Sequence, residues 1–380
     1  MPKLEGQLYL PNIRSIFVLY MALQASFFKK TFNFSFKART SRGSMIQKDS
    51  WYLKVWDTKS PEVFGMGEAG PLPGLSPEKP EDVDMQFGEV IQLISKGLTA
   101  NSLGSLLDIK EFFKSSRLSS SVIFAIETAF LDLKNGGARV IFDNRFLKGE
   151  PIPINGLVWM GGLDEMLQQV NIKLYDGFSC IKVKIGGMNF EKELDILQFI
   201  RRKYFRDTVS LRLDANGSFK DEDALYKLMD CSRYDVHSIE QPVKVGSPVM
   251  PELCKKSPIP IALDEELIGV NDKAQKIKLL DRIAPQFIIL KPMLHGGILG
   301  SEEWIGLANE RKIGWWMTSA LESNIGLNAI AQFAANYPIA VHQGLGTGSI
   351  YEDNVPSPLE VKRGSLIYNS QENWDLSGLY

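Results

Sequence analysis

Short apolar segments alternate with amphipathic segments through the middle of the chain. The segments CIKVKIGG, SLRLDANG, SIEQP, IALDEE and FIILKP are typical of β-strands, because they are short and contain many branched apolar residues. The segments FEKELDILQFIRRKYF, DEDALYKLMDC and EEWIGLANERK instead carry apolar residues at helical spacing. Strands that alternate with helices predict a parallel sheet, built either as a (β/α) barrel or as an open α/β sheet.

Each of these strand segments has a charged residue at the point where its apolar run stops. Those residues are Lys184, Asp214, Glu240, Asp264 and Lys291, which follow one another at intervals of 24 to 30 positions. A strand, a helix and two loops together need roughly that many residues. Because a barrel carries its active site at the carboxyl ends of its strands, we expect these five side chains to meet there.

The first third of the chain has a different pattern. Two strand-like segments, TFNFSFKA and SWYLKVWD, are joined by the polar segment RTSRGSMIQKD, which we interpret as a loop. Helical stretches follow around 83–97 and 103–114, and strands followed by helices indicate a small α+β domain. A further helix is predicted over 121–134, since its apolar residues form one stripe, serines 119–121 can cap it and Gly136 suits its end.

We therefore divide the chain into an N-terminal α+β domain at 1–118, a (β/α) barrel domain at 119–350 and a C-terminal segment at 351–380. The polar C-terminal segment is expected to be irregular and to pack back on the first domain. In the barrel, PIPINGLVWMGG is interpreted as the first strand, WWMTSALES as the seventh and HQGLGTGSIY as the eighth. Residues 1–20 are interpreted as a poorly ordered leader.

Composition narrows the classes of partner. The formal net charge is −2 and no long basic run is present, so the sequence offers no electrostatic support for nucleic-acid binding. No apolar run is long enough to span a bilayer. The three cysteines are widely spaced and form no CxxC pair, which favours reduced thiols in a cytoplasmic protein. We expect a small-molecule partner and neither a nucleic acid nor a membrane; the sequence does not indicate the oligomeric state.

The charged strand ends suggest a specific chemistry. Three carboxylates on adjacent strand ends, from Asp214, Glu240 and Asp264, form an all-oxygen site that suits Mg²⁺. Lys182 and Lys184 lie two residues apart and so share one face of their strand. Positive charge nearby lowers the proton affinity of an amine, which favours Lys184 as a base. A divalent metal next to an amine base matches removal of the proton α to a carboxylate, so a small carboxylate is the expected substrate.

The same residues resemble a known family. KxK, followed by Asp in LDAN, Glu in IEQP, Asp in LDE and Lys in LKP, is similar to the enolase superfamily and, within it, to the muconate-cycloisomerase subgroup. A lysine base with Mg²⁺ is a known arrangement in that superfamily. The segment GMGEAGPLPGLSPE is similar to the loop by which the family's capping domain covers the site. The resemblance implies a modified (β/α)8-type barrel with an N-terminal α+β capping domain, on which the C-terminal tail packs.

The resemblance also implies a role for each residue. Mg²⁺ would be bound by Asp214, Glu240 and Asp264. Lys184 would take the α-proton, Lys291 would stabilise the resulting enediolate from the opposite face, and Lys182 would support Lys184 or contact the substrate carboxylate. The remaining candidates are expected to bind substrate or to lie just behind the substrate pocket: Arg212, Asn216, Ser319 and Arg42, the last in a Thr40–Arg42 loop that closes over the site.

Three segments narrow the expected reaction. LKPMLHGG, TSALESNIGL and LPGLSPE most resemble the branch of the subgroup that eliminates water in a syn sense from 2-succinyl-6-hydroxy-2,4-cyclohexadiene-1-carboxylate during menaquinone biosynthesis. Racemisation of N-succinylamino acids and other cycloisomerase-type reactions use the same two lysines and stay open. A Schiff-base aldolase or a non-catalytic barrel are further alternatives from other classes, but neither gives three carboxylates a reason to converge.

Overall fold

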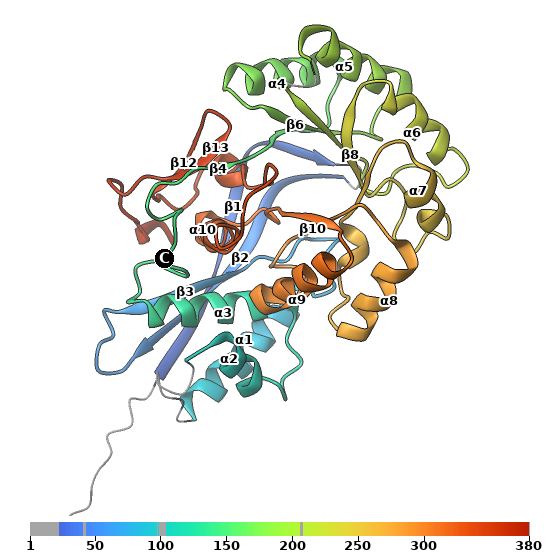
Figure 1. Cartoon of the computed structure of the whole chain (residues 1–380). Coiled ribbons are helices and arrows are strands. Elements are labelled where there is room, and N and C mark those ends of the chain that lie inside the picture. Colours follow the sequence, from blue (N-terminus) through green and yellow to red (C-terminus); the bar gives the residue numbers. More distant parts are fainter. Residues whose placement is uncertain (1–22, 41–42, 97, 99–103, 206–207, 380) are drawn as a thin grey trace, which may run out of the picture.

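The computed structural model describes residues 23–40, 43–96, 98, 104–205 and 208–379. Its described residues form two antiparallel sheets and one parallel sheet. Figure 1 shows the long hairpin of the first sheet running across the molecule, with the parallel sheet and its helices beside it.

The first sheet belongs to the N-terminal part of the chain. It contains β1 (Leu23–Thr40), β2 (Gly43–Asp57) and β3 (Phe64–Ala69), paired in that order. Strands β1 and β2 pair up to the Thr40–Gly43 step, so the loop predicted for RTSRGSMIQKD is instead the end of a long hairpin. That prediction was wrong because most of the described polar residues there are exposed side chains of a strand whose backbone remains paired.

Three helices pack on this sheet. They are α1 (Pro80–Ser95), α2 (Leu106–Phe112) and α3 (Ser120–Lys134). The core between sheet and helices is apolar and closed to solvent; its members include Trp51 and Leu53 of β2, Phe87 of α1 and Phe130 of α3. The predicted α+β arrangement of this region is therefore present.

Helix α3 joins this core to the barrel. Ala125 and Ala129 of α3 lie in the core under the first sheet, whereas Phe124 lies in the barrel core. A Cβ atom at Gly65 or Gly67 of β3 would come within 2 Å of a backbone oxygen of α3, so only glycine allows the strand to lie this close to the helix. The helix predicted over 121–134 is confirmed and is followed by Gly136, whose φ of 91° places it in the left-handed region.

The parallel sheet forms most of a barrel wall. Its described strands are β5 (Gly156–Val158), β6 (Cys180–Lys184), β7 (Ser210–Asp214), β8 (Val236–Glu240), β9 (Ile261–Leu263), β10 (Phe287–Leu290) and β11 (Gly314–Met317). The helices after these strands are α4 (Leu163–Tyr175), α5 (Phe190–Lys203), α6 (Ala224–Ser232), α7 (Met250–Lys256), α8 (Lys273–Ile283), α9 (Gly297–Glu310) and α10 (Asn324–Ala334). Figure 1 shows α4 to α9 on the outside of the curved sheet.

The barrel closes without a regular eighth strand. Gln343 forms an isolated parallel bridge with Ile154, and Gly344 forms one with Thr318. Within the described residues, these bridges connect the two ends of a seven-stranded sheet. The modified barrel that the family resemblance implies is therefore confirmed, and the open sheet that the alternation of strands and helices also allowed is not formed. The strand predicted over HQGLGTGSIY is limited to these bridges, and a short 3-10 helix, Thr347–Ser349, follows them.

The C-terminal segment is more regular than predicted. Strands β12 (Leu359–Lys362) and β13 (Ser365–Tyr368) form a hairpin that pairs with β4 (Ile152–Pro153) just before the barrel. The residues on either side of the hairpin pack on the first sheet: Tyr351 bridges to Phe34, and Leu379 lies in the same apolar cluster. The return of the tail to the N-terminal domain is therefore present, with the addition of the hairpin.

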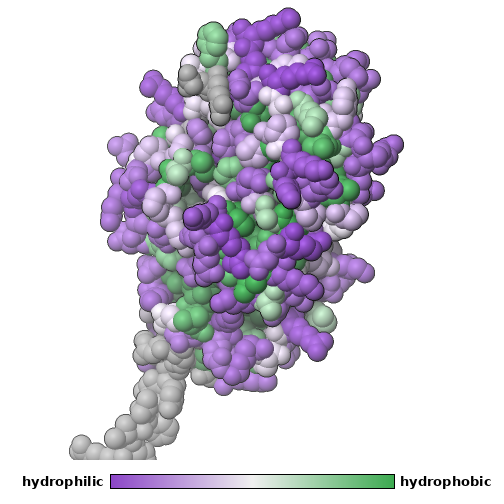
Figure 2. Space-filling model, turned by 45° about the vertical axis from the view of Figure 1, so that its right-hand side comes forward, coloured by the Kyte–Doolittle hydropathy of each residue, from purple (hydrophilic) through white to green (hydrophobic). Residues whose placement is uncertain are grey.

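One face of the molecule is mainly polar. Figure 2 shows a mainly hydrophilic face on which hydrophobic residues lie scattered between charged ones. No helix in the described ranges has the length and apolarity needed to cross a membrane. All three cysteines fall within those ranges, and each is a buried free thiol.

Candidate active site

The parallel strands bring the predicted charged residues to the same end of the sheet. Lys184 at the end of β6 lies opposite Asp214 at the end of β7, and Asp214 lies opposite Glu240 at the end of β8. Glu240 lies opposite Ala262 of β9, and Asp264 follows two residues later on the same face. Lys291 directly follows β10. The carboxyl ends of these strands therefore bring both lysines and all three carboxylates together.

The lysines contact the carboxylates directly. Lys184 Nζ donates to Asp214 Oδ2 at 2.8 Å, and Lys182 Nζ lies 3.0 Å from the same oxygen. Lys182 Nζ also donates to Glu240 Oε2 at 2.6 Å, and Lys291 Nζ donates to Asp264 Oδ2. All these side chains are buried, so the ion pairs lie in a region of low dielectric where each charge needs a partner.

This arrangement shifts the proton equilibria of the cluster. Burial alone would raise the pKa of Asp214, but the ammonium groups of Lys182 and Lys184 hold it well below its usual range. Burial and the neighbouring charges of Asp214 and Asp264 raise the pKa of Glu240 well above its usual range. Burial opposes the charged form of Lys182, yet Asp214 and Glu240 raise its pKa. Of the three acids, Glu240 is therefore the one whose pKa is raised, whereas the pKa values of Asp214 and Asp264 are lowered by their lysine partners.

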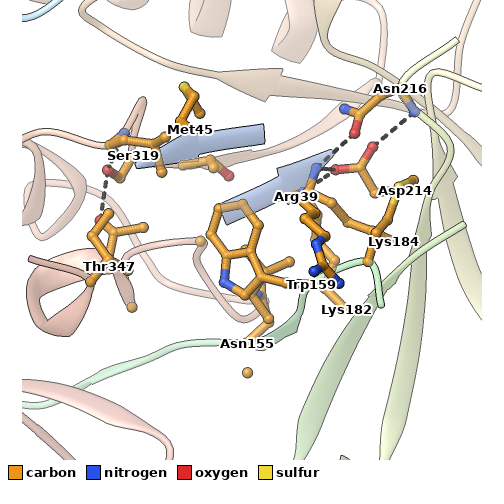
Figure 3. Close-up of a pocket in the computed structure, with 18 of the residues that line it drawn as sticks. Arg39, Met45, Asn155, Trp159, Lys182, Lys184, Asp214, Asn216, Ser319 and Thr347 are labelled. Atoms are coloured by element: carbon orange, nitrogen blue, oxygen red, sulfur yellow. Dashed lines mark hydrogen bonds and ion pairs between the residues drawn. The ribbon is translucent and has the colours of Figure 1, made fainter. Parts of the chain in front are cut away.

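The cluster lies in a cavity of about 650 Å³. The cavity is lined by eight of the predicted site residues: Lys182, Lys184, Asp214, Asn216, Glu240, Asp264, Lys291 and Ser319. Figure 3 shows Lys182, Lys184, Asp214 and Asn216 at one end of the cavity and Ser319 with Thr347 at the other. One end therefore carries the ionised groups, and the other end carries hydroxyl groups.

Two of the expected substrate contacts are already occupied by protein groups. Asn216 Oδ1 accepts from Lys184 Nζ at 2.8 Å, and Asn216 Nδ2 donates to Glu265 Oε1 at 3.0 Å. Ser319 Oγ donates to Glu322 Oε2 and accepts from Thr347 Oγ1 and from the Leu321 N–H. A hydroxyl has one donor and two acceptor sites, so Ser319 is fully hydrogen-bonded in this conformation.

Arg212 lies below the cavity and is not among the residues that line it. Its guanidinium carbon is 3.9 Å from the centre of the Trp316 ring, and Nη1 donates to the carbonyl oxygen of His342 at 2.8 Å. Arg212 shares the inward face of β7 with Asp214 but is one layer deeper in the barrel. Arg42, the fourth candidate for substrate contact, lies outside the described residues, as does Ser41 of the predicted lid loop.

The cavity also has a wall that the sequence reasoning missed. Phe36, near the end of the β1–β2 hairpin, makes an edge contact with Trp159 after β5, with the ring centres 5.5 Å apart. Arg39 of the same hairpin forms an ion pair with Glu165 of α4 at 3.4 Å. All four side chains line the cavity, so the hairpin covers its mouth. The sequence signals were the position of Trp159 just beyond the first barrel strand and the Thr40–Arg42 loop expected to close over the site.

The donor set is of the kind that binds a hard divalent cation. The three carboxylates offer only oxygen, and Asp264 Oδ1 is buried without a hydrogen-bond partner among the described residues. The spacing is less favourable: in the described part of the chain, no group of three His, Cys, Asp or Glu side chains is arranged to hold a metal ion. Lysine ammonium groups contact all three carboxylates instead. The chemistry of the site therefore fits Mg²⁺, provided that the lysines move aside.

Comparison with known proteins identifies the family. The family model described as "Enolase C-terminal domain-like" matches residues 165–371, which is more than half of the chain. The chain belongs to the enolase superfamily. The family predicted from KxK, LDAN, IEQP, LDE and LKP is thus confirmed.

Individual relatives extend this result. The chain is 40% identical over 370 residues to o-succinylbenzoate synthase from Desulfotalea psychrophila, covering 90% of this chain and 98% of that protein. The crystal structure of MenC from Desulfotalea psychrophila matches with a TM-score of 0.80 and 37% identity over 91% of this chain and 99% of that chain. A Cytophaga hutchinsonii dipeptide epimerase, complexed with Mg and D-Ala-L-Val, shares the fold with a TM-score of 0.78, at 21% identity over 91% of this chain and 93% of that chain.

Proposed function

We propose that the protein is an o-succinylbenzoate synthase, a lyase that removes water from 2-succinyl-6-hydroxy-2,4-cyclohexadiene-1-carboxylate. The observation that carries the proposal is the 40% identity to the Desulfotalea psychrophila enzyme of that name over almost its whole length. The cluster of lysines and carboxylates supports it, because removal of a proton α to a carboxylate needs a base and stabilisation of the developing negative charge.

Asp214, Glu240 and Asp264 are proposed as the ligands of Mg²⁺. Bound there, Mg²⁺ would stabilise the negative charge that develops on the substrate carboxylate and would replace the lysines as partners of the three acids. Without a dication, three buried carboxylates at adjacent strand ends must be neutralised by other cations. Lys182, Lys184 and Lys291 meet that need in the present conformation.

Lys184 is proposed as the base that removes the α-proton. The same amine then returns a proton to the departing hydroxyl, since a syn elimination leaves both groups on one face of the ring. Lys291 follows β10, across the strand ends from β6, and its ammonium group stabilises the enediolate from the opposite face. Lys182 orients Lys184 or contacts the substrate carboxylate. Loss of water forms an aromatic ring, which makes the reaction strongly favourable.

The balance of charge suits a substrate with two carboxylates. The three lysines of the cluster are matched in number by its three carboxylates. A divalent cation adds two positive charges to a buried region, and a dianionic substrate neutralises them. This charge matching favours joint binding of the metal and the substrate over binding of either alone.

Four further residues have supporting roles in the proposed reaction. Asn216 and Ser319 form parts of the pocket wall, Arg212 supports it from below, and Arg42 contacts the substrate tail. The domain boundaries are proposed to lie near residues 118 and 350. The cytoplasm is the proposed location, because buried free cysteines suit a reducing compartment.

An assay with purified protein, Mg²⁺ and the cyclohexadiene substrate tests the proposal. We expect the ultraviolet absorbance of the cyclohexadiene to disappear with a kcat in the usual range for enzymes, roughly 1–10³ s⁻¹. N-succinylamino acids serve as comparison substrates, since their racemisation uses the same proton abstraction. Racemisation that outpaces dehydration by orders of magnitude would overturn the assignment while leaving the family mechanism in place.

A further inference from the structure

Lys184 is held by a neutral group as well as by a carboxylate. Its Nζ donates to Asp214 Oδ2 and to Asn216 Oδ1, both at 2.8 Å. Asn216 lies two residues beyond the end of β7 and has a φ of 44°, a left-handed conformation in which asparagine is enriched. Its N–H donates back to Asp214 Oδ1 at 3.1 Å. This turn brings the amide of Asn216 over the strand end and next to the proposed base.

The contact with Lys184 depends on which way the amide faces. An ammonium group can only donate, so it needs the oxygen of Asn216 and is repelled by the nitrogen. Asn216 Nδ2 donates to Glu265 Oε1 at 3.0 Å, and a carboxylate can only accept. With Nδ2 held by Glu265, Oδ1 faces Lys184. Glu265 itself is buried and is not among the residues that line the cavity.

We propose that Glu265 is a positioning residue for the base: it fixes the orientation of the Asn216 amide, which in turn holds Lys184 in place. The inference rests on the proposed function, because it takes Lys184 as the base. It assigns Glu265 a task that differs from that of its neighbour Asp264, whose side chain contacts Lys291. The path runs from Glu265 on the loop after β9 to Asn216 on the loop after β7, and then to Lys184 on β6.

The neighbouring Glu266 provides a matched control. It is as buried as Glu265, but its carboxylate accepts from Gln241 Nε2 and from the Gly246 N–H, away from Asn216. Glu265→Gln and Glu266→Gln therefore remove the same charge from adjacent positions. Only the first substitution replaces an obligate acceptor next to Asn216 by an amide, which can present either a donor or an acceptor.

The decisive experiment is a double-mutant cycle in the dehydration assay. Glu265→Gln is expected to lower kcat by roughly tenfold or more, with KM and the Mg²⁺ concentration for half-maximal rate changed less than about twofold. In an Asn216→Ala background, the same substitution is expected to change kcat by less than about twofold, because the path is already broken. Glu266→Gln is expected to keep kcat within about twofold of wild type.

The proposal would be overturned if Glu265→Gln lowered kcat equally in the wild-type and the Asn216→Ala enzymes. It would also be overturned if weaker activation by Mg²⁺ explained the loss of kcat. If Glu265→Gln does not fold, as judged by its thermal midpoint, Asn216→Ala alone must still lower kcat without weakening Mg²⁺ activation; a full-rate Asn216→Ala enzyme is evidence against the path.

A second readout separates this inference from the proposed function. If the wild-type enzyme does not dehydrate the cyclohexadiene, the proposed function fails, and the positioning is then judged from crystal structures. We expect Lys184 Nζ to lie within hydrogen-bond distance of Asn216 in wild type and to move out of it in Glu265→Gln. An unchanged Lys184 position in the variant would rule the positioning role out.

Discussion

Glu68 of the N-terminal sheet accepts a hydrogen bond from the hydroxyl of Ser323, which lies 255 residues further along the chain at the start of α10. The same carboxylate accepts from the N–H groups of Ser323 and Gly326 and from the hydroxyl of Ser50. A carboxylate at a helix N-terminus satisfies N–H groups that have no partner within the helix. Glu68 therefore links the N-terminal domain to α10, the barrel helix that comes just after Ser319 of the cavity lining.

Glu68→Ala is expected to destabilise the fold strongly. The substitution leaves two buried N–H groups without their acceptor and removes one of the carboxylates that attract the buried Lys48, and such losses cost about 3–5 kcal/mol together. The measurement is the free energy of unfolding from urea titration. Glu62→Ala, at an exposed turn before β3, is the control and should change this free energy by less than about 0.5 kcal/mol. If Glu68→Ala lowers the free energy of unfolding as little as Glu62→Ala does, Glu68 does not link the two domains.

Lys184→Met should abolish most of the activity while leaving the fold intact. Methionine keeps the length of the side chain but cannot take or return a proton, so kcat is expected to fall by roughly a thousandfold or more. Lys291→Met is expected to reduce kcat on a similar scale through loss of charge stabilisation. The control is Lys192→Met on the exposed face of α5. Activity of Lys184→Met above about a tenth of wild type would exclude Lys184 as the base.

Removal of divalent metal is expected to stop the reaction reversibly. Treatment with EDTA should abolish dehydration, and added Mg²⁺ should restore it. A metal ion that binds the folded state and not the unfolded state also stabilises the protein. The stabilisation is about 2.7 kcal/mol at a Mg²⁺ concentration of 100 times Kd. The thermal midpoint should therefore rise with Mg²⁺ in wild type and in the exposed-surface control Glu360→Gln, but not in Asp264→Asn. An undiminished rate in EDTA would show that the three carboxylates serve another purpose.

Glu127 should make the stability depend on pH. Its carboxylate lies on α3 and accepts from the Ile298 and Leu299 N–H groups at the start of α9, and burial raises the pKa of Glu127 to about 8. A carboxyl whose pKa is higher in the folded state binds a proton more tightly in the folded state than in the unfolded state. The stabilisation from Glu127 is therefore complete below its ordinary pKa near 4.5, and it is lost as the pH rises through 8.

The Glu127→Gln variant isolates this effect. Glutamine keeps an acceptor for the N–H groups but does not ionise, so the stability difference between wild type and variant should change with pH. The free energy of unfolding is measured with urea at pH 5 and at pH 8. Between these two pH values, wild type should lose stability relative to the variant by at most about 5 kcal/mol, since one pKa unit corresponds to about 1.4 kcal/mol. A difference that does not vary between the two pH values would mean that Glu127 stays ionised throughout.

Trp159→Ala is expected to weaken substrate binding. The indole lines the cavity and contacts Phe36 of the covering hairpin, so its loss opens the mouth and removes apolar contact area. KM should rise by roughly tenfold, with a smaller change in kcat. Tyr175→Ala, which removes a fully exposed aromatic side chain on α4, is the control and should leave KM unchanged. Equal KM values for both variants would mean that the hairpin contact plays no part in binding.

The convergence of Lys184, Asp214, Glu240, Asp264 and Lys291 could be predicted from the sequence because each residue ends an apolar strand segment at a regular interval. Period-two alternation also placed Lys182 with Lys184. The alternation did not show that Arg212 is one layer too deep to line the cavity, since depth depends on how neighbouring strands are staggered. It also missed the Phe36–Trp159 contact, whose members come from different domains.

The sequence alone determined the alternation of strands and helices, the helix at α3 and the charged residues at the strand ends, because these follow from local periodicity and from residues near one another in the chain. Only the tertiary structure decided that Glu68 meets Ser323, that Asn216 lies between Lys184 and Glu265, and that the C-terminal hairpin pairs with β4. Such contacts join residues far apart in sequence. Their geometry depends on strand register and on packing between domains, which no local pattern encodes.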